Sequence, residues 1–96
     1  MSERIEKLKD AVQVMHRCTA THRESVHVRE MFRDQVAWEG IVEVFDIVGH
    51  PKADRCYAWS YHDDSDSPEY ATVLKIPPAT SAALAVKVYI ASLGRK

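Results

Sequence analysis

The sequence predicts an α+β domain, a two-layer structure in which a four-stranded antiparallel meander has one helix before it and one after it. Apolar residues recur at helical spacing near both ends of the chain, whereas residues 25–76 form four strand-like stretches rich in β-branched and aromatic residues. Short connections favour antiparallel neighbours, with both helices on one face of the sheet. The 96 residues contain no repeat and no long linker, so residues 1–96 are expected to form a single domain.

The first element is expected to be a helix over residues 3–17. Ser2 can cap it by accepting a hydrogen bond from a backbone N–H of the first turn. Its apolar residues are spaced by three, four and three positions: Ile5, Leu8, Val12 and Met15. Residues 19–22 break this periodicity, which predicts a connection to the sheet.

Two strands follow, over residues 25–33 and 36–48, with a turn at Asp34 and Gln35. Gly40 is the expected site of a bulge. Bulky residues occur on both faces of the second strand, with Trp38, Val42, Val44 and Val48 on one and Ile41, Phe45 and Ile47 on the other. This strand is therefore expected to be central.

The third strand, residues 55–62, has the strongest alternation. Its large rings point to one face and its small side chains to the other: Tyr57, Trp59 and Tyr61 against Cys56, Ala58 and Ser60. The two faces must therefore have different neighbours. A fourth strand is expected over residues 70–76, after a polar loop that contains Asp63, Asp64 and Asp66.

The last element is a helix over residues 82–93, which ends at Gly94. This helix is apolar on nearly every side, and such a helix is normally buried on nearly every side. In a two-layer domain Leu84, Val88 and Tyr89 need a cover. The sequence leaves two alternatives open: the N-terminal helix packs beside them, or they form the interface of a homodimer.

Composition excludes several classes of function. The formal net charge of −1 gives no overall field that would attract nucleic acid or an anionic membrane. No apolar run approaches the ~20 residues of a membrane-spanning helix, and the charged start is not a secretory signal. Cys18 and Cys56 form no CxxC pair, so reduced thiols and a cytoplasmic location are expected.

The rings of Trp38, Tyr57, Trp59 and Tyr61 are the most suggestive candidate binding surface. On an exposed sheet face they could stack on single-stranded nucleic acid or on a flat ligand, although the same alternation also fills a core. The neighbouring acids Asp63, Asp64 and Asp66 make a phosphate track, and with it nucleic-acid binding, the less favoured interpretation.

No metal or cofactor site is expected. His16, Cys18 and His22 have ligand chemistry but lack the spacing of a structural zinc site, and the acidic loop lacks the glycine and terminal glutamate of an EF-hand. His50 and Cys56 could support a small enzyme, yet no catalytic motif accompanies them.

No motif by itself identifies the function. The favoured hypothesis is a small cytoplasmic, non-enzymatic protein-interaction module that forms a homodimer through Leu84, Val88 and Tyr89. The alternatives are a sheet-face binder that uses the four rings and a small enzyme around His50 and Cys56.

Overall fold

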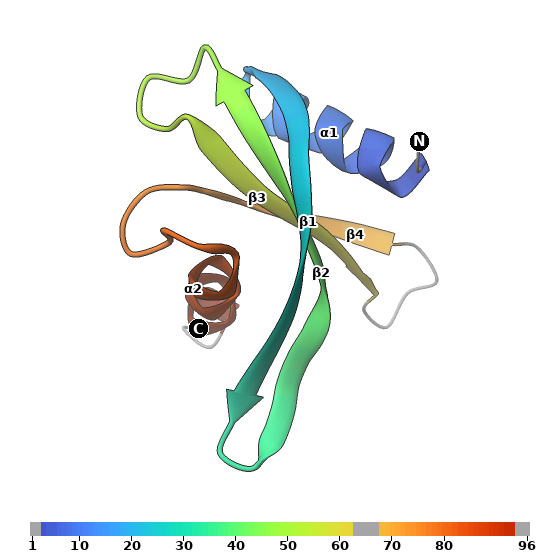
Figure 1. Cartoon of the computed structure of the whole chain (residues 1–96), viewed down its shortest axis with the longest axis vertical. Coiled ribbons are helices and arrows are strands. Elements are labelled where there is room, and N and C mark those ends of the chain that lie inside the picture. Colours follow the sequence, from blue (N-terminus) through green and yellow to red (C-terminus); the bar gives the residue numbers. More distant parts are fainter. Residues whose placement is uncertain (1–2, 63–67, 94–96) are drawn as a thin grey trace.

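The computed structural model describes residues 3–62 and 68–93. The element order is α1 (Glu3–His16), β1 (Thr19–Phe32), β2 (Gln35–Val48), β3 (Arg55–His62), β4 (Pro68–Leu74) and α2 (Ala82–Leu93). The strands form one antiparallel sheet in the order β1-β2-β3-β4 (Figure 1). The predicted α+β class and four-stranded meander with terminal helices are thus confirmed. The acidic loop and the caps expected at Ser2 and Gly94 lie outside the described residues.

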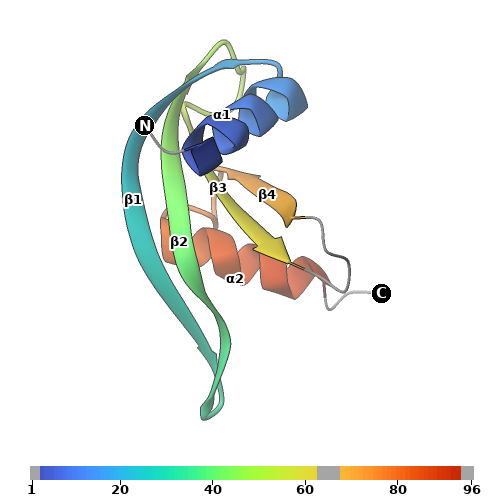
Figure 2. The same cartoon turned by 90° about the vertical axis from the view of Figure 1, so that its right-hand side faces the viewer.

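The two helices lie on opposite sides of the sheet, so the expected placement of both on one face is wrong (Figures 1 and 2). Leu8 and Val12 of α1 pack with Phe45 on one face. Ala85 of α2 packs with Val44 on the other. The physical reason is the bulk on both faces of β2: a two-layer domain would leave one apolar face in water, at a cost proportional to its area.

The side chains of β3 match the two helices in size. Its large rings meet the small residues of α2, where Trp59 packs in one cluster with Ala82 and Ala85. Its small residues meet the larger side chains of α1, where Ala58 packs with Leu8. Each face is filled by pairing large with small groups, which close packing requires.

β1 begins at Thr19, six residues before the expected start at Ser25. Ala20 lies opposite Ile47 in the sheet, and both side chains are buried beneath α1. This tertiary contact overrides the weak local pattern of residues 19–22. The register shifts between His22 and Glu24, which leaves one unpaired residue and bends the strand.

The tip of the β1–β2 hairpin differs from the expectation by one residue. The turn residues are Arg33 and Asp34, and Arg33 has a left-handed φ of 59°. The predicted bulge at Gly40 is also displaced, because the register shift lies opposite Glu30, toward the hairpin tip. Gly40 instead lies beneath the Trp38 ring, where an added Cβ would be 3.0 Å from two ring carbons.

The sheet has one long free edge. β1 pairs with β2 over nearly its whole length, whereas β2 pairs with β3 only over residues 43–46. Because β1 is the first strand of the sheet, no strand of the described chain pairs with its outer side. The main-chain groups along that side are available to water or to a partner.

Candidate functional site

The predicted aromatic surface is not an exposed face. Trp59 is 1% exposed and Tyr57 is 3% exposed, because α2 covers both rings. Trp38 is half-buried, with its ring centroid 5.8 Å from that of Trp59. The structure does not describe the side chain of Tyr61. The interpretation of Tyr57 and Trp59 as an open stacking platform is therefore wrong, and these rings form the core beneath α2.

The three predicted self-association residues divide between core and surface. Tyr89 packs edge-on against Trp59, with ring centroids 5.3 Å apart, and Val88 packs against the same cluster. Leu84 is 38% exposed. Only Leu84 therefore presents a large part of its side chain to water, and the homodimer stays a prediction.

His50 and Cys56 do not form a catalytic pair. Cys56 is fully buried beneath α1, and burial is the main reason that its pKa rises to about 12. The thiol therefore stays protonated, and a protonated thiol is a poor nucleophile. No hydrogen bond joins Cys56 to His50, whose Nδ1 accepts the backbone N–H of Lys52 at 3.0 Å.

His16 and His50 lie close together, with ring centroids 6.2 Å apart. They are poorly arranged for a metal ion. The Lys52 N–H donates to Nδ1 of His50, so in the neutral ring the proton lies on Nε2, and Nε2 of His16 is hydrogen-bonded to Thr72 at 2.8 Å. Burial and the neighbouring His50 also lower the pKa of His16. Within the described part of the chain, no group of three or more metal-ligating side chains occurs.

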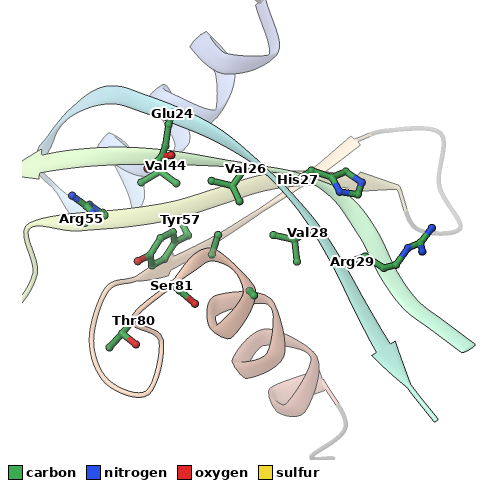
Figure 3. Close-up of a pocket in the computed structure, with 12 residues that line it drawn as sticks. Glu24, Val26, His27, Val28, Arg29, Val44, Arg55, Tyr57, Thr80 and Ser81 are labelled. Atoms are coloured by element: carbon green, nitrogen blue, oxygen red, sulfur yellow. The ribbon is translucent and has the colours of Figure 1, made fainter. Parts of the chain in front are cut away.

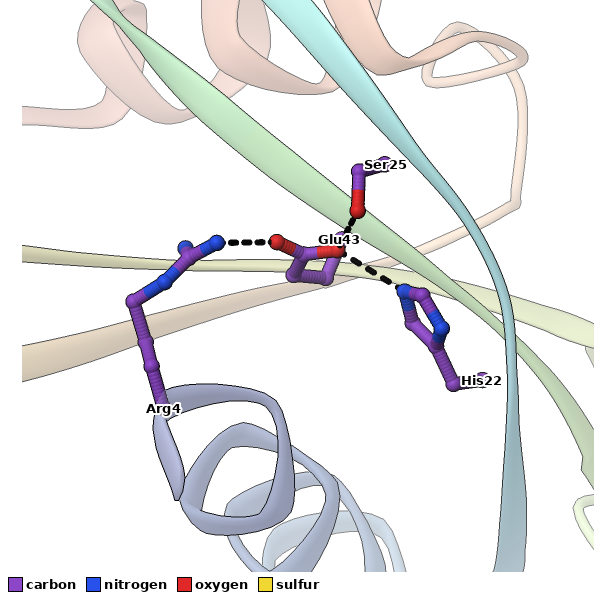
Figure 4. Close-up of polar contacts among 4 residues, drawn as sticks. All are labelled: Arg4, His22, Ser25 and Glu43. Carbon is purple, nitrogen blue, oxygen red and sulfur yellow. Dashed lines mark hydrogen bonds and ion pairs between the residues drawn. The ribbon is translucent and has the colours of Figure 1, made fainter. Parts of the chain in front are cut away.

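A buried carboxylate lies on the α1 face of the sheet (Figure 4). Glu43 of β2 is fully buried, and its two oxygens accept hydrogen bonds from three side chains. Arg4, in the first turn of α1, binds one oxygen, while Ser25 and His22 of β1 bind the other, His22 at 2.8 Å. The cluster thus joins α1, β1 and β2 through one charge.

The chemistry of this cluster is structural. Burial raises the pKa of Glu43, but hydrogen bonds from Ser25 and His22 and the guanidinium of Arg4 outweigh it, so the pKa is below its usual value. Glu43 stays ionised and cannot act as a general acid. A catalytic triad needs the histidine between serine and acid. Here both Ser25 and His22 contact the acid, so no nucleophile is activated.

The described structure has a groove of about 540 Å³ on the α2 face of the sheet, between β1 and the start of α2 (Figure 3). Its floor is apolar and consists of Val26, Val28, Val44 and Tyr57. Residues 80–83, at and before the first turn of α2, form the opposite wall. The Ser81 hydroxyl accepts the Leu84 N–H at 3.2 Å and caps α2 there.

His27 and Arg29 line the groove with their main chains. Both side chains bind Glu39 on the α1 face of the sheet, His27 at 2.9 Å and Arg29 at 3.4 Å. Figure 3 shows these two side chains directed away from residues 80–81. The main chain of β1, the edge strand of the sheet, therefore borders the groove beside its apolar floor.

Charge gathers at one end of the groove. Asp46 forms ion pairs with Arg23 at 3.0 Å and with Arg55 at 3.5 Å. Arg55 lines the groove. Burial raises the pKa of Tyr57 despite the nearby Arg55, so its phenol is neutral. Glu24 of β1 stands at the same end and is exposed.

Neither the groove between β1 and α2 nor the cluster around Glu43 was predicted from the sequence. Val26 and Val28 alternate with polar residues along the strand, but the groove depends on where α2 begins relative to β1, which a local pattern does not report. Glu43 had one usable signal, an acid on the strand face shared by Ile41 and Phe45.

No protein-family model matches the sequence, and neither the curated proteins nor the solved structures include a significant match. Among the described residues, no helix combines the length and apolar character that crossing a membrane requires.

Proposed function

We propose that this chain is a non-enzymatic protein-interaction module that holds part of its partner in the groove between β1 and α2. The observation that carries this proposal is the groove itself. Its volume of about 540 Å³ is in the range of binding sites, and apolar side chains form its floor. Val28, Val44 and Tyr57 line it but are at most 4% exposed. Val26 is the half-buried residue of the floor, and it offers a partner apolar surface whose burial drives association.

The polar groups around the groove favour binding over catalysis. Arg55 is paired with Asp46, the His27 side chain points to the opposite face, and Tyr57 is neutral. A general acid and base would have to converge within hydrogen-bond reach of one substrate atom, and these groups do not.

A protein partner is favoured over a small molecule by the wall that β1 contributes. A free strand edge offers main-chain donors and acceptors along its whole length, which suits a polypeptide. The predicted homodimer belongs to this proposal, with Leu84 as the exposed residue of α2. Both cysteines are free thiols, which fits work in the cytoplasm.

The test fills the groove without disturbing the core. Ala83 is exposed on α2 and lines the groove, so Ala83→Trp should occupy it. Ala91 is exposed on the same helix outside the groove, which makes Ala91→Trp the matched control. Random peptides displayed on phage are selected on the wild-type protein and on each variant.

Wild-type and Ala91→Trp protein should enrich the same peptides, and Ala83→Trp should enrich none of them. Thermal melting of each variant verifies that it is folded. Peptides that bind wild-type and Ala83→Trp protein equally would place the interaction elsewhere, and the groove would lose its proposed role.

A further inference from the structure

The free edge of β1 is regular where it borders the groove. The register shifts lie between His22 and Glu24 and between Glu30 and Met31, so residues 24–30 form an uninterrupted stretch. Native edges are commonly blocked by bulges, prolines or inward-pointing charges. Residues 24–30 contain no proline, and both register shifts lie outside the stretch. The edge can therefore accept another strand.

The dimensions suit a short peptide. Five of the positions 24–29 line the groove, all except Ser25. At about 3.3 Å per residue, this stretch corresponds to roughly five or six residues of an added strand. At the far end, Lys87 of α2 approaches Glu30 of β1 at 3.7 Å. This ion pair joins the helix to the strand one residue beyond the last lining position, Arg29.

An added strand would direct every second side chain toward α2. Those side chains would stand next to Val26 and Val28 of β1, which are apolar, whereas Tyr57 of β3 lies two strands farther into the sheet. The intervening side chains would lie on the α1 face, beside His27 and Arg29, which already bind Glu39. The groove thus suits alternating aliphatic residues with polar residues between them.

The charged end adds a preference for a carboxylate. Asp46 faces the two guanidinium groups of Arg23 and Arg55, so this trio keeps one net positive charge, which the exposed Glu24 at the same end balances. Arg55 is its member inside the groove, opposite Glu24 on the β1 side. A carboxylate near Arg55 and Ser81 would complement this charge and keep its distance from Glu24.

We infer that the partner binds as an added β-strand along residues 24–29, with aliphatic side chains over Val26 and Val28 and a carboxylate beside Arg55. This inference rests on the proposed function, because it specifies what the groove of the interaction module holds. Main-chain hydrogen bonds to β1 supply affinity, and the floor and Arg55 supply selectivity.

The probe is an octapeptide that carries fluorescein and an N-terminal acetyl group. Valine alternates with threonine over its first seven residues, and its eighth residue is glutamate. Fluorescence anisotropy measures its Kd. Methylation of the main-chain nitrogens that face β1 should weaken binding about tenfold or more, because it removes several hydrogen bonds and keeps the side chains. Replacement of the glutamate by glutamine should weaken binding about fivefold.

The protein variants separate the role of Arg55 from general charge. Arg55→Met should weaken binding about fivefold, whereas Arg23→Met removes the same charge and a contact to the same Asp46 from outside the groove. Binding by Arg23→Met should stay within about twofold of the wild type. Equal losses in both variants would overturn the placement of the carboxylate.

The outcomes also separate this inference from the proposed function. Equal binding of the methylated and unmethylated peptides, with both lost in Ala83→Trp, would overturn strand addition and leave the groove as an interaction site. Strand addition would also be overturned, and the groove kept as an interaction site, by a second result. In that result the octapeptide does not bind, whereas selected peptides of another pattern bind the wild type and do not bind Ala83→Trp. If no peptide shows binding that Ala83→Trp blocks, both proposals fail.

Discussion

The two faces of the sheet are closed in different ways. On the α1 face, Glu43 is buried with three hydrogen-bond donors, one of which is Arg4 in the first turn of the helix. On the α2 face, the rings of β3 meet alanines, and the buried cluster contains no charged residue. A buried carboxylate requires specific partners, so it fixes where α1 begins. Apolar packing is non-directional, and it allows α2 to leave a groove beside β1.

The largest expected effect is on the α2 face. Trp59→Ala would remove a ring that is 1% exposed and contacts Trp38 and Tyr89, so it should lower the free energy of unfolding by about 3–5 kcal/mol. Urea denaturation followed by circular dichroism measures the change. Val48→Ala, at an exposed position, should change it by less than about 0.5 kcal/mol. Similar losses in both variants would contradict the burial of this ring.

A smaller loss is expected from the α1 face. Glu43→Gln removes the charge that Arg4 and His22 bind, but their side chains are 40% and 27% exposed and can regain water. The loss should therefore be about 1.5–3 kcal/mol, the usual value for hydrogen bonds to a charged group. Glu39→Gln is the matched control, since Glu39 also has two ion-pair partners but is exposed. Its loss should be below about 1 kcal/mol, and a loss equal to that of Glu43→Gln would refute the special role of burial.

The wild type and Glu43→Gln also test how the contribution of Glu43 to stability depends on pH. The pKa of Glu43 is lower in the folded than in the unfolded protein, so its contribution is complete above the unfolded pKa and is lost as pH falls through the folded pKa. The stability difference between wild type and Glu43→Gln should be constant above about pH 5 and should shrink below about pH 4.5. Urea titrations at stepwise lower pH measure it, and a difference that grows on acidification would contradict the assignment.

The smallest expected effect on stability concerns self-association. Leu84 is 38% exposed, so Leu84→Asp should alter the unfolding free energy of a single chain by less than about 1 kcal/mol. If the predicted homodimer forms through α2, sedimentation equilibrium should give a dimer for the wild type and a monomer for this variant. Val14→Asp, at an exposed position on α1, serves as the control. A monomeric wild type at all concentrations would refute the homodimer.

The sequence could predict the elements but not the contacts between them. The alternation of β3 correctly assigned Tyr57 and Trp59 to one face and Cys56 to the other. The local pattern could not predict which face of β3 is exposed, because this depends on the path of the chain after β4. The candidate stacking surface failed for this reason: α2 returns across the rings.

Local chemistry by itself determined the antiparallel meander, its terminal helices and the bulk on both faces of β2, because hydrophobic periodicity reports which sides of an element are buried. The tertiary structure decided the rest. It placed α1 and α2 on opposite faces, paired Glu43 with Arg4 across 39 positions, and opened the groove between β1 and α2. These features depend on contacts between distant segments, whose geometry is set by the packing of the whole chain.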